Sequence, residues 1–347
     1  MRVQSAPLVT MHADNQHYDA QCFLSVGDLC LGLLERVAVE GANTSNALTV
    51  LTRMAALTKI GQKYGKTNLL DVRSKWDGTG VWAAATEDMS LSDALRRCLH
   101  IGREESPGSP MLRQCPHRFA VIDASGIVTD IVAQSDIAMY LRRNIDLLDP
   151  SIVDATVKAL GLGSQGSRRV VTVEASTPTI DCFQLMQSSN VQAVAVVDDG
   201  TDAIVGNLSE TDLMPLQCDA YGALALPVGE FLVHAHLIVP KLDNDRMLYS
   251  PQTTAFGAAL MCAGKRLTVT VTPDATVREI LDLMHTRAVH RVWVVDDARR
   301  PTGVIALSDV LAAIAVEVAG AGETDTAKSM ARSTGTTTTT AATSSPA

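Results

Sequence analysis

One short pattern occurs four times along this 347-residue chain, and it constrains the fold more than any other feature. Residues 117–136 and 290–309 align without a gap, and 19 positions separate the opening histidine from the closing aspartate in both. A third copy at 192–212 is one residue longer, and a fourth at 4–28 opens the chain. Self-similarity of this kind indicates repeated copies of one structural unit.

Each copy has the local signature of a strand, a turn, a second strand and a helix start. An apolar run rich in Val and Ile ends in aspartate with glycine nearby, which is typical of a hairpin. The aspartate that closes the copy is a helix N-terminal signal, because its carboxylate accepts hydrogen bonds from unpaired backbone N–H groups. Upstream, Val277, Ile280, Leu281 and Met284 form an amphipathic helical stripe, and the matching alignment places Cys182 in a core position. Short strands at 170–173 and 268–272 precede these helices.

The sequence therefore predicts an α/β protein of four βαββα repeats, paired into two modules. The expected boundaries are a first module at 1–145 (repeats at about 1–40 and 80–145, connector 41–79), a linker at 146–164, a second module at 165–318 (repeats at about 168–217 and 265–318, connector 218–264), and a disordered Thr/Ser/Ala/Gly-rich tail at 319–347. The first repeat lacks its opening strand and helix. We expect a truncated or partial sequence there, with an uncovered apolar face and a poorly formed first module.

Composition narrows the function classes. The net charge of −9 argues against a general nucleic-acid binder. The seven cysteines are scattered without a C-x-x-C pair, so we expect no metal site and a reduced compartment, with a cytoplasmic or additionally nuclear location. No apolar run reaches about 18 residues, so no membrane span is predicted. No nucleophile–base, P-loop or metal constellation occurs, so we predict that the chain is not an enzyme.

Three other features have simpler interpretations. Residues 161–166 fit the G-x-G-x-x-G fingerprint, but a helical run at 152–160 precedes them and a strand follows, which reverses the order that dinucleotide binding needs. We interpret them as a helix C-cap and linker. Trp82 and Trp293 are expected in a core or interface. His234 and His236 could ligate a metal, but we expect strand-edge histidines.

The apolar strand, Asp/Gly turn, second strand and Ser/Thr-x-x-Asp before a helix resemble the cystathionine-β-synthase (CBS) domain. Four copies, with His-Arg in the second and fourth, resemble the γ subunit of AMP-activated protein kinase and its plant relatives. Residues 223–232 are also similar to that family's connector. The resemblance implies pseudo-twofold modules with adenine nucleotides in the clefts between repeats. It implies that the helix-start aspartates hold the ribose diol and that the His-Arg pairs reach the phosphates.

The chemistry of these residues agrees with that implication. A carboxylate can accept two hydrogen bonds from a cis-diol, Arg presents a fork to phosphate oxygens, and His adds a donor whose charge a phosphate favours. The candidate nucleotide-binding residues are Asp28, Asp136, Asp212, Asp309, His117, Arg118, His290, Arg291, Ser25, Ser209, Ser135 and Ser308.

Several positions depart from the family pattern. The Ser three residues before the aspartate is replaced by Ala133 and Ala306 in copies two and four, where Ser135 and Ser308 can compensate. Copies one and three carry Gln4-Ser5 and Gln192-Ala193 instead of His-Arg. Asp136 resembles the plant relatives, since the animal subunit has a basic residue there. Two readings stay open: the aspartates can be simple helix caps, and one member of each His-Arg pair can be solvated or packed, because neighbours on a strand point to opposite faces.

These features lead to one expected function and two alternatives. The chain is expected to be a regulatory subunit that binds AMP, ADP or ATP, without a catalytic cofactor. Its partners would be a catalytic Ser/Thr kinase subunit and a scaffold subunit of an energy-sensing complex. The alternatives are a stand-alone CBS-domain regulator of another enzyme and a nucleotide-free scaffold.

Overall fold

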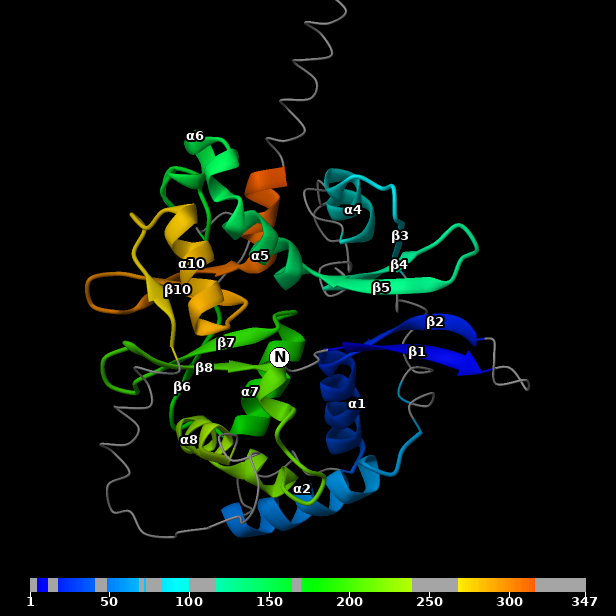
Figure 1. Ribbon diagram of the computed structural model, residues 1–347. Helices are drawn as coiled ribbons and strands as arrows, with labels where there is room; N and C mark the ends of the chain where they lie inside the picture. Colours follow the sequence, from blue (N-terminus) through cyan, green and yellow to red (C-terminus); the bar gives the residue numbers. More distant parts are fainter. Residues whose placement is uncertain are drawn as a thin grey trace, which may run out of the picture.

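The fold is seen in a computed structural model, which describes residues 5–11, 18–40, 49–68, 72, 83–99, 117–163, 170–238 and 268–315 (Figure 1). Four antiparallel hairpins share one register. Their strands are β1 (Ser5–Met11) with β2 (Tyr18–Ser25), β4 (Arg118–Ile122) with β5 (Val128–Ala133), β7 (Ala193–Val197) with β8 (Ile204–Ser209), and β10 (Arg291–Val295) with β11 (Pro301–Ala306). In each hairpin four consecutive pairs are followed by a bulge, as between Val121 and Ile122 or between Val294 and Val295. The repeat seen in the sequence is therefore also a repeat of backbone geometry.

Three of the hairpins carry a third, parallel strand. These strands are β3 (Ala84–Thr86), β6 (Thr172–Glu174) and β9 (Thr270–Val271), and the connecting helices are α4 (Leu91–Cys98), α7 (Thr179–Ser188) and α10 (Val277–Arg287). The β1–β2 sheet has two strands. A mixed α/β fold with the β-α-β-β order is confirmed for copies two, three and four.

A helix follows each hairpin, with one exception to the expected length. The helices are α1 (Val26–Val39), α5 (Gln134–Arg143), the 3₁₀ turn η3 (Glu210–Leu213), and a helix described over 307–315. The third copy forms only a 3₁₀ turn because Pro215 has no backbone N–H to continue a helix. The remaining elements are α2 (Val50–Tyr64), η2 (Ile145–Leu147), α6 (Pro150–Val153), η4 (Tyr221–Ala225) and α8 (Val228–Ile238).

Two sequence-based expectations about local structure are wrong. His234 and His236 lie in α8, not on a strand edge, because η4 and Pro227 start a helix in this apolar stretch. The helical run expected at 152–160 ends at Val153 and continues as turns, held by a bridge between Thr156 and Thr276.

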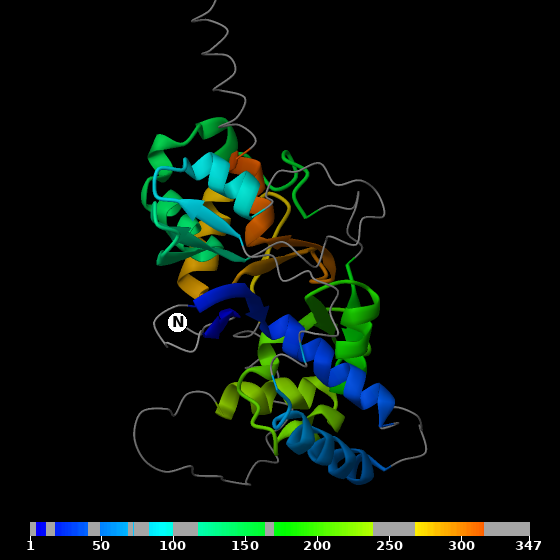
Figure 2. The same ribbon diagram turned by 90° about the vertical axis from the view of Figure 1, so that its right-hand side faces the viewer.

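The hydrophobic cores combine repeats from opposite ends of the chain. The first core joins α1 and α2 to the third repeat, through residues such as Leu34, Ile60, Phe183 and Phe231. Leu33, Leu34 and Val37 are at most 3% exposed, so the expectation that the half repeat leaves this helix uncovered is wrong. The second core joins the second and fourth repeats in the same way. Figures 1 and 2 show these two halves as the lower and upper parts of the molecule.

The sheets meet where the two halves join. Trp293 and Val295 of β10 pack against Ala195 and Ile204 of the third repeat. The indole N–H of Trp293 donates to Asn207 Oδ1 at 3.0 Å, so this residue is a core and interface aromatic as expected; Trp82 lies outside the described residues. Both views place the β1–β2 hairpin beside the β4–β5 hairpin. The division of the chain into two modules at the linker 146–164 stays a prediction. Each of the two hydrophobic cores contains residues from both sides of this linker.

Candidate functional site

The first strand residue of each hairpin lies opposite the N-cap residue of the following helix. Arg118 faces Ala133 and Arg291 faces Ala306, whereas Ala193 faces Ser209. Directly opposed residues in an antiparallel pair are close neighbours. An alanine therefore leaves room beside each arginine, and a serine occurs where the facing residue is small. Copies two and four pair Arg with Ala, and copy three pairs Ala with Ser. The loss of the serine in copies two and four and the loss of the arginine in copy three therefore compensate each other in side-chain volume.

The four helix-start aspartates all act as helix caps. In each case Oδ2 accepts the backbone N–H of the N-cap residue three positions earlier: Ser25 to Asp28 at 2.6 Å, Ala133 to Asp136 at 2.9 Å, Ser209 to Asp212 at 2.7 Å, and Ala306 to Asp309 at 2.8 Å. The hydroxyls of Ser25 and Ser209 also donate to Asp28 and Asp212. Because a carboxylate has two oxygens and about four lone-pair sites, capping leaves the ribose-binding reading open.

Two His-Arg pairs from different repeats form a cluster of charge at the centre of the molecule. We call His117, Arg118, His290 and Arg291 the basic cluster. Exclusion of water by surrounding protein, followed by the charges of Arg291, His290 and Arg118, lowers the pKa of His117 to about 4. The pKa of His290 is lowered by desolvation and then by Arg291 and Arg118. The effects of Arg291 and His290 on His117, and of Arg118 on His290, indicate that the starts of β4 and β10 lie close together.

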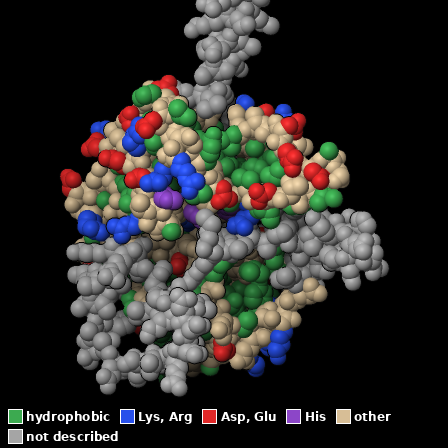
Figure 3. Space-filling view, in the orientation of Figure 1, with side chains coloured by type: hydrophobic (Ala, Val, Ile, Leu, Met, Phe, Trp, Pro, Cys, Tyr) green, Lys and Arg blue, Asp and Glu red, His purple; other side chains and the backbone are tan. Residues whose placement is uncertain are grey.

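The side chains of the basic cluster are surrounded by protein atoms, but part of each still reaches the surface. Both histidines have exposed surface and both arginines are half-buried. Figure 3 shows histidine side chains, beside Lys and Arg, at the level where the upper and lower halves meet. A ligand can therefore reach these cationic groups from outside.

Acidic groups face the basic cluster from three helix starts. Burial lowers the pKa of Arg118, and the neighbouring Asp136 opposes that effect. Burial also lowers the pKa of Arg291, opposed by Glu210, Asp212 and Asp309. Arg291 therefore lies near the helix-start aspartates of both the third and the fourth repeat.

The remaining candidates occupy different surroundings. Ser135 and Ser308 are half-buried at the second residue of their helices, next to the aspartates. Asp28 and Ser25 stand at the start of α1, where Gly27 packs against the Glu210 carboxylate of η3. None of the charge effects found on the basic cluster comes from Asp28.

Sequence reasoning missed Gln134, Gln192 and Glu210. Gln192 Nε2 lies 3.2 Å from His117 Nε2, and Gln134 makes a second side-chain hydrogen bond to His117. Gln192 occupies the repeat position of His117 and His290, so its alignment could have identified it. From the sequence alone, Gln192 stands only as a residue that replaces a histidine.

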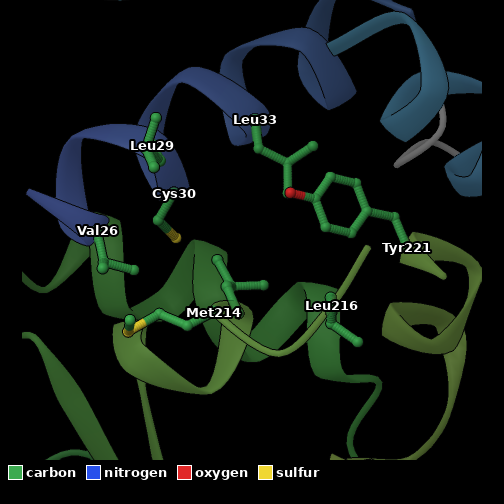
Figure 4. Close-up of a pocket in the computed structure, with 8 residues that line it drawn as sticks. Val26, Leu29, Cys30, Leu33, Met214, Leu216 and Tyr221 are labelled. Atoms are coloured by element: carbon green, nitrogen blue, oxygen red, sulfur yellow. The ribbon is translucent and has the colours of Figure 1, made fainter. Parts of the chain in front are cut away.

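An apolar cavity of about 310 Å³ lies behind the starts of α1 and η3 (Figure 4). It is lined by Val26, Leu29, Cys30, Leu33, Leu213, Met214, Leu216 and Tyr221. These side chains carry no charge at neutral pH, and a phosphate would lose its hydration here without compensation. The cavity therefore does not form part of the phosphate site.

The glycine motif has a structural role at its described residues. Gly161 and Gly163 adopt left-handed backbone conformations, with φ of 63° and 66°. Gly163 packs against β11, where a side chain on Gly303 would collide with the Gly163 carbonyl. Residues 164–166 lie outside the described part, as does the expected tail at 319–347.

Two kinds of feature are absent from the residues that the structure describes. In that part of the chain no group of three or more His, Cys, Asp or Glu side chains is placed to hold a metal ion. No described helix is both long and apolar enough to cross a membrane.

Comparison with known proteins identifies the repeat. Residues 166–217 and 267–316 match the CBS domain. The chain is 28% identical over 207 residues to 5'-AMP-activated protein kinase subunit gamma-3 of Sus scrofa, covering 59% of this chain and 35% of that protein. It is 26% identical over 168 residues to the SNF1-related protein kinase regulatory subunit gamma-1-like of Arabidopsis thaliana, covering 46% and 32%. The chain thus spans about a third of these relatives.

Among solved structures, a Methanocaldococcus jannaschii protein described as a candidate archaeal homologue of the AMPK γ subunit aligns over 88% of this chain and 86% of that one. The alignment has 13% identity and a TM-score of 0.48.

Proposed function

We propose that this protein, which contains CBS domains at 166–217 and 267–316 and is similar to AMPK γ subunits, binds adenine nucleotides and regulates a Ser/Thr kinase complex. The observation that carries the proposal is the basic cluster, where His-Arg pairs from two repeats meet beside Asp212 and Asp309. Surrounding protein and the two arginines lower the pKa of both histidines, and a phosphate would balance the arginine charges with charge-assisted hydrogen bonds.

The arrangement supports a ligand with a polar diol and an anionic end. Arg291 and His290 would meet the phosphate, while Asp309 or Asp212 would accept hydrogen bonds from the ribose. Arg118 and His117 present the same groups beside Asp136. AMP, ADP and ATP share this combination of ribose and phosphate, and all three are candidates.

Regulation would follow from differential binding. The phosphate site takes groups from the second and fourth repeats, and Gln192 adds one from the third. A ligand that binds one arrangement of these repeats more tightly shifts the population toward it. A partner that recognises that arrangement then responds to nucleotide concentration. The partners proposed are a catalytic Ser/Thr kinase subunit and a scaffold subunit, with a cytoplasmic and nuclear location.

Calorimetry on the full chain with AMP, ADP, ATP and adenosine tests the binding. Losing one charged hydrogen bond costs about 1.5–3 kcal/mol, so Asp309→Ala or Asp212→Ala should weaken nucleotide binding roughly 10- to 150-fold. Asp93→Ala is the matched control, because Asp93 accepts from Ser90 Oγ at the third residue of α4 but belongs to a different part of the fold. The control should lower stability and leave nucleotide affinity unchanged.

Two results would overturn the proposal. Absence of binding by all three nucleotides at millimolar concentration would favour a nucleotide-free scaffold. Normal binding by both aspartate variants would show that the site is elsewhere. Co-purification with mass spectrometry then distinguishes a kinase complex from another regulated enzyme.

A further inference from the structure

His117 is held between two glutamines from different repeats. Gln192, just before β7, brings its Nε2 to 3.2 Å from His117 Nε2, and Gln134 of α5 bonds the same side chain. The backbone N–H of Gln134 also donates to the His117 carbonyl at 2.9 Å, and the Gln134 side chain is only 6% exposed. A ring with polar partners on both sides has a defined orientation and a defined protonation state.

The charged groups around His117 all favour its neutral form. The charges that act on it are those of Arg291 and His290 at the start of β10 and of Arg118, the next residue in the chain. The nearby acids face the arginines instead: Asp136 acts on Arg118, and Glu210, Asp212 and Asp309 act on Arg291. Desolvation and these three basic neighbours hold the pKa of His117 at about 4. The pKa of His117 should therefore rise when a negative charge enters the site.

We propose that His117 and Gln192 form a proton-coupled phosphate sensor, in which the ring is neutral in the empty site and becomes protonated when a phosphate binds. This inference rests on the proposed nucleotide-binding function and adds a regulatory property to it. The proton comes from the buffer and no covalent bond changes. In the neutral ring one nitrogen donates and the other accepts, so the Gln192 amide donates to Nε2 and Nδ1 carries the hydrogen. An incoming phosphate dianion favours the imidazolium, whose Nε2–H donates instead.

The direction of the pH effect follows from this cycle. Because the bound state holds one more proton than the free state, affinity for AMP rises as pH falls through the neutral range. Adenosine has no phosphate, and its affinity should not change with pH through this residue. Since Gln192 belongs to the third repeat and His117 to the second, the sensor also couples these two repeats.

Calorimetry on the full chain with AMP at about pH 7, in two buffers of different ionisation enthalpy, measures the protons taken up. Wild type should take up more protons than His117→Asn, by at most one per AMP bound, and the ratio of their affinities should rise by up to about tenfold per pH unit on acidification. Because the AMP phosphate itself titrates near pH 6, this difference between two proteins is the informative quantity. His285→Asn, on the exposed surface of α10, is the matched control and should behave as wild type.

A second variant tests the role of Gln192. Gln192→Glu places a carboxylate beside the ring, so the pKa of His117 in the free protein should rise and the proton uptake should fall, most clearly at about pH 6. If wild type and His117→Asn bind AMP with the same proton uptake, the sensor is wrong while nucleotide binding stands. Unchanged uptake in Gln192→Glu would likewise overturn the sensor. If AMP does not bind wild type at all, both proposals fail. His117→Gln replaces His117→Asn if the latter does not fold.

Discussion

The basic cluster concentrates positive charge where the two halves of the molecule meet, in a chain whose net charge is −9. Such groups repel one another, and each tends to lose its charge when protein displaces its water. The histidines can respond by staying neutral, but arginine keeps its charge. Arg118 and Arg291 therefore stay charged beside the acidic groups of the helix starts, and an anionic ligand would add further charge-assisted hydrogen bonds.

Arg291 should discriminate between ligands by charge. Arg291→Ala should weaken AMP binding roughly 10- to 150-fold, because a charge-assisted hydrogen bond of about 1.5–3 kcal/mol is lost. Adenosine affinity should stay near the wild-type value, since it has no phosphate. Arg300→Ala is the control: Arg300 pairs with Asp296 at 2.9 Å on the β10–β11 turn and should have no effect on either ligand. Equal losses for AMP and adenosine would contradict the assignment of Arg291 to the phosphate.

The lowered pKa of His117 also predicts how stability depends on pH. The folded protein keeps His117 neutral down to about pH 4, whereas the unfolded chain protonates it near 6.5. The unfolded state therefore binds more protons between these values, and the free energy of unfolding should fall as pH falls through this window. His290 shifts in the same direction. Urea unfolding of wild type and His117→Asn from neutral pH downward should give a shallower pH dependence for the variant, and parallel curves would refute this.

Sequence reasoning identified the helix-start aspartates and the His-Arg pairs of the site, and it missed Gln134, Gln192 and Glu210. Asp212 and Asp309 stand out because a carboxylate can accept hydrogen bonds from a ribose diol, and Arg118 and Arg291 stand out because arginine binds phosphate oxygens. Gln192 has no such signature alone, and its contact with His117 depends on how the third repeat packs against the second. That packing is tertiary information, which repeat alignment does not contain.

At the element scale, the hairpins were predictable and the segments between repeats were not. Val/Ile runs with Asp/Gly turns specify strands locally, and their common register follows from one repeated turn geometry. The helix expected after β8 forms only a 3₁₀ turn, because Pro215 has no backbone N–H to continue a helix. His234 and His236 were misassigned because a short apolar stretch fits either period.

The contact between Gly163 and Gly303 gives an element-scale prediction. Gly303→Ala should destabilise the protein by about 1–3 kcal/mol, because its new Cβ would overlap the Gly163 backbone and force β11 away from the 161–163 turn. Gly200→Ala is the control, since the atom nearest to its added Cβ is Asp198 Oδ1 at 3.7 Å. Thermal or urea unfolding measures both. A Gly303→Ala protein as stable as Gly200→Ala would mean that the two glycines are not packed together.

At the scale of the whole molecule, the sequence order of the repeats differs from the way they share cores. The predicted modules follow the chain, with repeats one and two and repeats three and four together. The first core instead unites repeats one and three, and the second unites two and four. Local patterns show which face of a helix is apolar, but several repeats offer similar faces. Sequence analysis could therefore not choose the partner of each helix.

This arrangement predicts that the fragment 165–318 cannot fold as the full chain does. Removing residues 1–164 exposes Phe183 and Met186 of α7 on the side of the first core that α1 and α2 cover. It also removes α4 and α5 from the second core, and apolar surface costs about 25 cal/mol per Å² when water reaches it. The fragment should self-associate, as measured by light scattering, bind a hydrophobic dye, and lose the cooperative unfolding transition.

The control is 1–318, which keeps both cores. Mixing 1–164 with 165–318 should restore a cooperative complex, because each half supplies the surface that the other lacks. A monomeric fragment 165–318 that unfolds cooperatively at the midpoint of the full chain would show that the cores are separable.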